Sequence, residues 1–287
     1  MQPLSATAKG VTKRIILCAD DFALHAAVSD GIVQLIEQAR LSATSVMVLS
    51  PRWPQDARRL QALRGQMDVG LHLDWTSPFA RAAGHGVTLP AGLLQAALRG
   101  FSQTAARLVI ARQLDAFEDH WQAPPDFVDG HQHIQQWDGI RQALVQVLSQ
   151  RYQPAPYVRL SRTCAPAFEI KARVISAMGA AALTTLARQS GVPLTAALAG
   201  VYDFSGDEKT YGQRMHQWLA QVPDGGLIMC HPASAMPPGD QIGAARVQEH
   251  AYLRSAAFAQ TLAQLGVCLV RGRATIAPIR ALNLQSE

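Results

Sequence analysis

Short apolar runs alternate along the chain with longer amphipathic stretches, a rhythm typical of parallel β-strands joined by helices. Strands are expected at residues 15–19, 45–49, 67–72, 126–131, 157–160, 201–204, 227–230 and 267–270. Amphipathic helices are expected around Ile32 and Ile36 and over residues 53–63 and 103–120. About eight strands with helical crossovers favour an α/β fold of the irregular (β/α) barrel kind, similar to a TIM barrel, over a doubly wound sheet.

Two stretches interrupt this rhythm, residues 74–100 and residues 233–243, and both contain proline and glycine. Each follows a strand that ends in a candidate site residue, so we interpret them as substrate-facing loops rather than interdomain linkers. The barrel is expected to form a single domain over residues 13–280. Residues 1–12 are expected to form a flexible N-terminal tail, and residues 281–287 a C-terminal tail.

The composition suits a globular enzyme with a large interior, since 48% of the 287 residues are hydrophobic and only 16% are charged. No apolar run reaches the roughly 20 residues that a membrane-spanning helix needs, and the start of the chain does not resemble a signal peptide. The four cysteines, Cys18, Cys164, Cys230 and Cys268, are far apart, and three of the four lie in apolar strand-like runs. We therefore expect a cytoplasmic protein with no integral membrane segment and no disulfide.

The chain is basic, with a formal net charge of +5 and a pI of about 9.3. Nucleic-acid-binding surfaces cluster Lys and Arg with interleaved aromatic residues, and no run of that kind is present. We therefore expect no nucleic-acid partner, whereas acidic or phosphate-bearing substrates are compatible with the charge. The sequence does not determine the oligomeric state, and it is compatible with a homodimer.

Four of the expected strands end in aspartate or histidine. Asp20 and Asp21 close the first, His72 closes another, residues 129–133 read Asp-Gly-His-Gln-His, and His231 follows the run at 227–230. The carboxyl ends of parallel strands meet at one rim of an α/β fold, where such folds keep their chemistry. Carboxylates and imidazoles gathered at one rim have the composition of a metal site.

Local geometry suggests how these side chains divide their roles. Asp20 and Asp21 point to opposite sides unless the strand turns there, so that one can bind metal while the other takes a proton. On an extended chain His131 and His133 lie on the same side, and Asp129 can orient one of them from behind. Nucleotide-binding glycine motifs, the Gly-x-Ser-x-Gly elbow and the His-Glu-x-x-His pattern are all absent from the sequence.

The strand ends belong to four longer motifs, Cys18-Ala19-Asp20-Asp21-Phe22, Val69-Gly70-Leu71-His72-Leu73, Asp129-Gly130-His131-Gln132-His133 and Met229-Cys230-His231-Pro232-Ala233. In this order and spacing they resemble the YdjC-like carbohydrate deacetylase family, which includes chitooligosaccharide deacetylases and hopanoid-biosynthesis-associated members. The Arg246-x-x-Glu249 stretch also looks like this family's C-terminal pattern. Each motif is moderately specific, and four in order are strong.

The resemblance implies an irregular (β/α) barrel that holds one divalent metal ion. Asp21, His72 and His131 match the family's metal ligands, and Asp20 matches its general base. His231 matches the histidine near the end of the barrel, the candidate general acid. The implied reaction is removal of an acetyl group from an acetylated amino sugar by metal-activated water, and the sugar can be free, oligomeric or part of a glycolipid.

Four residues near the motifs have roles that the sequence leaves open. Ala23 stands where the family has glycine, which can alter the turn after Asp21. Gln135 stands where a third histidine is often seen, which indicates that this outer position is not a ligand. Arg159 and Arg162 are interpreted either as surface arginines or as contacts to an acidic or phosphorylated part of the substrate.

Two imidazoles and one carboxylate are softer than the oxygen shell that Mg²⁺ prefers, so Zn²⁺, Co²⁺ or Mn²⁺ is the better chemical match. Family precedent includes Mg²⁺, and the metal stays open between these ions. Two other interpretations are another metal-dependent ester or phosphoester hydrolase, and a non-catalytic carbohydrate-binding barrel. Asp20 and His231 argue against the latter, because a binding module needs neither.

Overall fold

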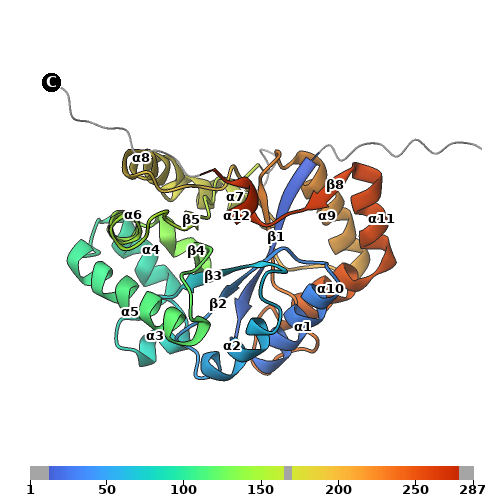
Figure 1. The fold of residues 1–287 in the computed structure, drawn as a ribbon, viewed down its shortest axis with the longest axis horizontal. Helices are drawn as coiled ribbons and strands as arrows, with labels where there is room; N and C mark the ends of the chain where they lie inside the picture. The colour runs from blue at the N-terminus through green and yellow to red at the C-terminus, as the bar shows by residue number, and fades with distance from the viewer. Residues whose placement is uncertain (1–12, 165–169, 278–287) are drawn as a thin grey trace, which may run out of the picture.

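A curled sheet of parallel strands lies at the centre of the molecule, and helices surround it (Figure 1). The computed structural model describes residues 13–164 and 170–277. The strands in these ranges are β1 Lys13–Phe22, β2 Ala43–Val46, β3 Asp68–Leu73, β4 Phe127–Gly130, β5 Tyr157–Val158, β6 Leu198–Ala199, β7 Leu227–Cys230 and β8 Val267–Leu269. The helices are α1 Ala26–Glu37, α2 Trp53–Gln61, α3 Pro78–Ala82, α4 Leu89–Ala97, α5 Gln103–Trp121, the 3₁₀ helix η1 His131–Gln136, α6 Ile140–Arg151, α7 Ile170–Ala177, α8 Ala180–Ser190, α9 Glu208–Gln221, α10 Gly243–Arg254, α11 Ala256–Leu265 and α12 Gly272–Thr275.

The sheet has the strand order β5-β4-β3-β2-β1-β7-β6, and β8 pairs with the start of β1. Every pair of strands is parallel. Between the two ends of this order, isolated parallel bridges join Val158 to Leu194 and Thr163 to Leu198. The sheet is therefore an irregular (β/α) barrel whose last side is closed by short pairings, and the expected single α/β domain of this class is confirmed.

Successive residues of β1 face opposite sides of the sheet. Ile15 and Leu17 pack against the surrounding helices, whereas Ile16 and Cys18 belong to the apolar cluster inside the barrel. Both faces of the strand are covered, which explains why it reads as a continuous apolar run. Asp20 is the next residue of β1 to face inward after Ile16 and Cys18. The side chains inside the barrel therefore change from apolar to polar at the carboxyl end of the strands.

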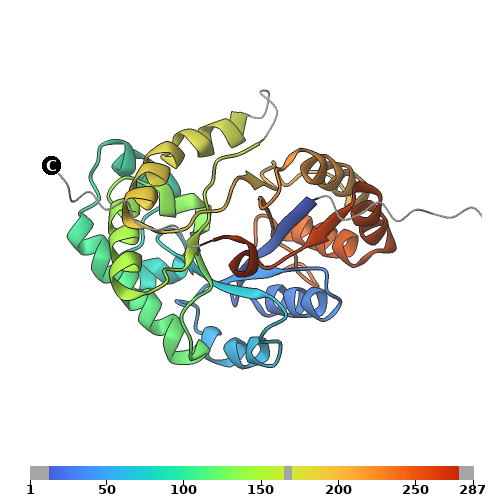
Figure 2. The same ribbon diagram turned by 45° about the horizontal axis from the view of Figure 1, so that its top comes forward.

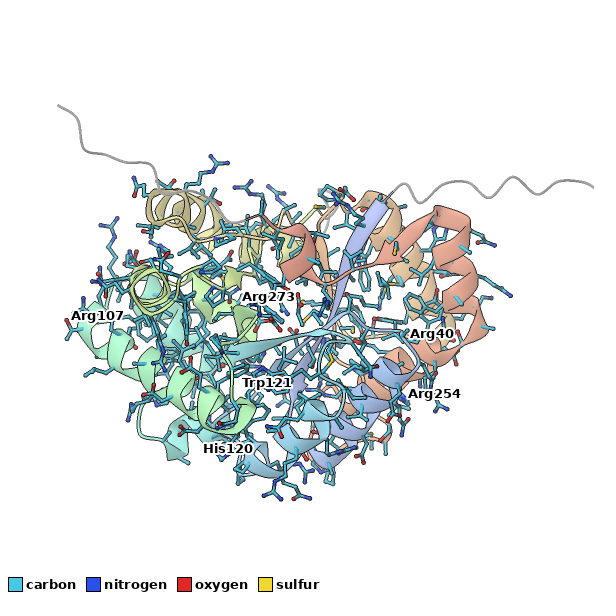
Figure 3. All side chains as sticks on the ribbon, viewed as in Figure 1. Arg40, Arg107, His120, Trp121, Arg254 and Arg273 are labelled. Carbon is cyan, nitrogen blue, oxygen red and sulfur yellow. The ribbon has the colours of Figure 1, made fainter. Side chains whose placement is uncertain are left out.

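The short helix α12 covers the opposite, amino-terminal end of the barrel, as Figure 2 shows. Val270 and Ile276, on either side of α12, pack against the apolar cluster inside the barrel. Arg273, labelled in Figure 3, donates its backbone N–H to Asp68 Oδ2 over 2.9 Å. Tyr157 donates its hydroxyl to the same oxygen over 3.0 Å. Asp68 is thus a buried carboxylate that ties α12 to the sheet.

Replacing Asp68 with asparagine should flatten the pH dependence of stability between about pH 4 and pH 6. Burial raises the pKa of Asp68 to about 6, so in this window the folded protein holds a proton that the unfolded chain has released. The free energy of unfolding of the wild type should therefore fall as pH rises, with a contribution from Asp68 of up to about 3 kcal/mol. The asparagine variant has no proton to lose at this position. Urea unfolding of both proteins at pH 4 and pH 7 measures the difference, and equal changes in the two proteins would contradict it.

Two expected strands are displaced. The strand expected at 201–204 is β6 at residues 198–199, because Gly200 turns the chain away with φ 94°, and a Cβ there would lie 2.1 Å from the Met229 carbonyl oxygen. The strand expected at 45–49 is β2, which starts two residues earlier. Its pairing ends at Val46, opposite Phe22, where the register with β1 shifts.

The expectation of a continuous loop over residues 74–100 is wrong, because α3 and α4 lie within it. The Ser77 side chain accepts hydrogen bonds from the backbone at the start of α3, and Thr88 does so for α4. Each helix has a proline in its first turn, where the missing N–H costs nothing, so Pro78 and Pro90 begin helices here. Residues 233–242 form no helix or strand, as expected.

Three further expectations concern the whole chain. The expected tails, 1–12 and 281–287, lie outside the described residues, as do residues 278–280. None of the helices in the described ranges is long and apolar enough to cross a membrane. The cysteines are all free thiols, as expected: Cys18, Cys164, Cys230 and Cys268.

Candidate functional site

A β-bulge at the end of β1 turns Asp20 and Asp21 apart. The register of β1 against β2 shifts between Ala19 and Phe22, and Asp21 has a left-handed backbone with φ 69°. Aspartate tolerates this conformation better than most residues, and bulges of this kind re-aim side chains next to functional sites. Asp20 therefore faces the barrel interior while Asp21 faces β3 and η1. The two carboxylates have separate neighbours, but a turn of the strand separates them and not the alternation of an extended chain.

Asp21, His72 and His131 come together at the carboxyl end of the barrel. Asp21 Oδ1 lies 3.4 Å from His72 Nε2 and 3.2 Å from His131 Nδ1. One ligand atom from each residue lies within 4.8 Å of the other two. Asp21 and His72 are buried and His131 is half-buried, so the group has two protected ligands and one at the opening. This donor set suits a divalent ion with open coordination positions.

The hydrogen bonds of Asp21 support this fit. Arg246 donates to Asp21 Oδ2 over 2.7 Å, but Oδ1 is buried and has no hydrogen-bond partner among the described residues. A buried carboxylate oxygen without a partner is costly. Burial alone would raise the pKa of Asp21, but Arg246 and the imidazoles of His131 and His72 outweigh it and hold that pKa well below its usual value. An ionised Oδ1 that faces two imidazoles would be satisfied by a cation.

Asp129 orients His72, whereas the sequence assigned it to an imidazole of its own motif. The register of β3 against β4 pairs His72 with Asp129, and His72 Nδ1 lies 2.6 Å from Asp129 Oδ1. A proton on Nδ1 leaves Nε2 free to bind a metal. Burial would lower the pKa of His72, but Asp129 outweighs it and raises the pKa to about 10. The surroundings of this ring therefore favour a positive charge, which a bound cation would supply.

The expectation that His131 and His133 lie on the same side of an extended chain is wrong. The 3₁₀ helix η1 begins at His131, and both Gln132 and His133 have left-handed backbones with φ 56° and 63°. The two imidazoles therefore diverge, and His133 Nδ1 lies 3.0 Å from the Ser161 hydroxyl. Burial and the nearby Arg159 lower the pKa of His133 to about 3, so this ring is neutral and lies outside the Asp21 group.

The two histidines of this motif offer a matched test of the ligand set. We expect His131→Gln to weaken zinc binding by more than about 100-fold, because even partners outside the ligand set are worth 10–100-fold. His133→Gln should leave zinc affinity close to that of the wild type, because its ring contacts Ser161 instead. Zinc titration of both purified variants against a fluorescent chelator gives the two affinities. Equal losses in the two variants would show that the ligand set is wrong.

Arg159 is fully buried between two carboxylates, so both interpretations of it from the sequence are wrong. Its guanidinium donates to Asp20 over 2.5 and 2.7 Å and forms an ion pair with Asp129. Burial alone would raise the pKa of Asp20, but Arg159 outweighs it and keeps Asp20 ionised. Tyr157 faces the barrel interior, and two-residue alternation along the strand places Arg159 there too. Arg162 is exposed and donates to the Thr184 hydroxyl.

His231 lies beyond β7 and faces Asp20, with 4.0 Å between His231 Nε2 and Asp20 Oδ2. Burial lowers the pKa of His231 to about 4, so the ring is neutral near neutral pH. Glu249 accepts a hydrogen bond from the His231 backbone N–H over 2.5 Å and another from the Tyr202 hydroxyl over 2.6 Å. The Arg246-x-x-Glu249 pattern thus places one residue against Asp21 and the other against His231.

The two departures from the family pattern are accommodated locally. Ala23 has a left-handed backbone with φ 71°, a conformation that glycine would adopt without strain. Gln135 is buried and donates to the Arg159 carbonyl and to the Ser161 hydroxyl over 3.1 and 3.0 Å. Its amide therefore supports the backbone around Arg159.

The fold and the site define an irregular α/β barrel with a candidate metal centre at the carboxyl end of its strands. The chain belongs to the YdjC-like protein family, whose model matches residues 14–264. This match confirms the resemblance that the four motifs indicated. A comparison with curated protein sequences found no match.

Solved structures share this fold at low sequence identity. A candidate cellobiose-phosphate cleavage protein from Enterococcus faecalis V583 is 17% identical, with a TM-score of 0.67 over 93% of this chain and 100% of that one. A peptidoglycan N-acetylglucosamine deacetylase, solved with a benzamide ligand, is 12% identical, with a TM-score of 0.51 over 92% of this chain and 87% of that one. Both likenesses show the fold.

Proposed function

We propose that this protein is a metal-dependent hydrolase that removes an acetyl group from an N-acetylated sugar. The observation that carries the proposal is the group of Asp21, His72 and His131, which could hold a metal ion. Asp20 and His231 face each other next to this group and are not part of it. Amide hydrolysis needs polarisation of the carbonyl, an activated water and a proton for the departing amine. One deacetylase of amino sugars shares the fold, and the family resemblance of the motifs points the same way.

The side chains of the site divide the work. A divalent ion held by Asp21, His72 and His131 would supply Lewis acidity to the acetyl carbonyl and the attacking water. Asp20, ionised and fixed by Arg159, takes a proton from that water. The C–O bond forms, the C–N bond breaks, and the products are acetate and the free amine.

The proton for the leaving amine reaches it through His231. This ring is neutral before the reaction, because burial lowers its pKa to about 4. The pKa of Asp20 is lower still, since Arg159 stabilises the carboxylate. The order of these pKa values favours transfer of a proton from Asp20 to His231 Nε2, which faces it at 4.0 Å, and from there to the amine nitrogen.

Phosphoester hydrolysis is less well supported by the charges of the site. Among the residues that the structure describes, Arg159 and Arg246 are the buried arginines beside the site, and both are engaged with carboxylates. Neither is directed at a substrate phosphate. The remaining alternative, a non-catalytic carbohydrate-binding barrel, does not account for Asp20 and His231 facing each other.

The test is release of acetate and of phosphate from a panel that holds N-acetylated monosaccharides, chitooligosaccharides, a glycolipid and phosphorylated disaccharides. Protein stripped with a chelator is compared with protein reloaded with zinc, magnesium, cobalt or manganese. We expect acetate release from at least one N-acetylated sugar, only after reloading. Phosphate release alone, or no product from the reloaded protein across the panel, would contradict the proposal.

Glu249→Gln should lower kcat by about tenfold to a hundredfold with little change in KM or zinc affinity. Glu249 fixes the His231 backbone, and its Oε1 lies 4.0 Å from His231 Nδ1. Burial raises the pKa of Glu249 to about 7, so above that pH its carboxylate would support a protonated ring. Tyr202→Phe is the matched control, because it removes one donor to Glu249 and keeps the carboxylate. Steady-state kinetics of both variants decide the matter. A rise in KM alone would assign Glu249 to substrate binding instead.

A further inference from the structure

Helix α4 presents an apolar face to solvent. The exposed residues of α4 and its C-cap are Pro90, Ala91, Leu94, Ala97 and Leu98. Leu94 and Leu98 are 61% and 74% exposed. They are one helical turn apart and so share a face. The outer face of a surface helix is normally polar, so this face is suited to an apolar partner.

The segment around α4 is positively charged. Residues 75–114 contain Arg81, Arg99, Arg107 and Arg112 and no Lys, Asp or Glu, although acidic residues number 21 in the whole chain of 287. Arg81, Arg99 and Arg112 are exposed, and Figure 3 shows Arg107 at the outer edge of the molecule. The apolar face thus lies within a stretch of net charge +4. Apolar side chains combined with an excess of arginine match the chemistry of an anionic lipid surface.

The inner side of α4 packs against the residue that follows η1. A Cβ at Gly92 would lie 2.5 Å from the Trp137 ring, so glycine lets the helix approach this closely. Trp137 is buried and directly follows η1, which begins with His131. The helix is therefore held on one side and exposed on the other, next to the carboxyl end of the barrel.

We propose that α4 docks this protein on the surface of an anionic membrane. Leu94 and Leu98 enter the headgroup region, and the arginines of residues 75–114 contact lipid phosphates. A second copy of the chain on the same face fits less well, because a twofold contact would bring two segments of charge +4 together. Two leucines provide little apolar area, so binding depends on charge and weakens as salt rises.

The test is co-sedimentation of the full chain with vesicles. We expect binding to vesicles of phosphatidylcholine with about 30% phosphatidylglycerol, and little binding to phosphatidylcholine alone or to the mixed vesicles at high salt. The double variant Leu94→Gln, Leu98→Gln should bind the mixed vesicles about tenfold more weakly, because it loses two apolar side chains. Val174→Gln is the control, since Val174 is 53% exposed on another helix.

Each result bears on this proposal alone, because sedimentation needs no catalytic activity. Equal binding of the double variant and the wild type would overturn it, as would equal binding to neutral and anionic vesicles. Sedimentation equilibrium without lipid tests whether a second copy of the chain binds the α4 face instead. A wild-type dimer that the double variant converts to a monomer would identify the α4 face as a contact between copies and would also overturn the proposal.

Discussion

Asp20→Asn should reduce acetate release by about 10²–10⁴-fold, the usual worth of a proton-transfer group. Asparagine keeps the shape of the side chain and still accepts a hydrogen bond from Arg159, but it cannot take a proton from water. Zinc affinity should change little, because Asp20 lies outside the Asp21, His72 and His131 group. Acetate assays at saturating zinc, together with zinc titration, separate the two effects.

Asp129→Asn is the control for this result. Asp129 is the other carboxylate on Arg159, but it acts through His72 and not on the water. Its loss should weaken zinc binding by about 10–100-fold, as is usual for a partner of a metal ligand. Excess zinc should then restore much of its activity. Recovery of the Asp20 variant by excess zinc would contradict the role of Asp20 as the base.

Arg159→Met should lower the free energy of unfolding by about 3–5 kcal/mol, the usual cost of removing one partner from a buried ion pair. Methionine fills much of the space, but Asp20 and Asp129 are left in the barrel without their cation. Arg162→Met is the matched control, because Arg162 is exposed and only three residues away. A surface change of this kind costs less than about 0.5 kcal/mol. Urea unfolding of the wild type and both variants at pH 7 measures the effect.

The pH dependence of the unfolding free energy gives a second test of the Arg159→Met prediction. In the wild type, Arg159 holds the pKa of Asp20 below its ordinary value, so the pair stabilises the fold above about pH 4 and loses that contribution as pH falls. The variant lacks this contribution at every pH. The gap in unfolding free energy between wild type and variant should therefore shrink in acid. Urea unfolding between pH 4 and pH 2 measures this change, and a gap that stays constant over that range would mean that lost packing, and not the ion pair, causes the instability.

The helices in the segment 74–100 show where sequence reasoning stops short. Pro78 and Pro90 suggest a loop when they are considered alone, because proline breaks helices from within. Each follows closely on a residue that caps a helix, Ser77 or Thr88, and proline in the first turn is favourable. The signal is present in the sequence, and the caps taken together with the prolines predict both helices.

The sequence by itself determined the class of fold and the positions of Asp20, Asp21, His72, His131 and His231 at the strand ends. These features are local, since each strand carries its own apolar run and its own terminal side chain, and parallel strands bring their carboxyl ends to one rim. Only the tertiary structure decided the partners of these side chains. His72 meets Asp129 across 57 residues and Arg159 meets Asp20 across 139 residues. Such contacts depend on strand register and on which way a side chain turns inside the barrel, and hydrophobic patterning does not specify either.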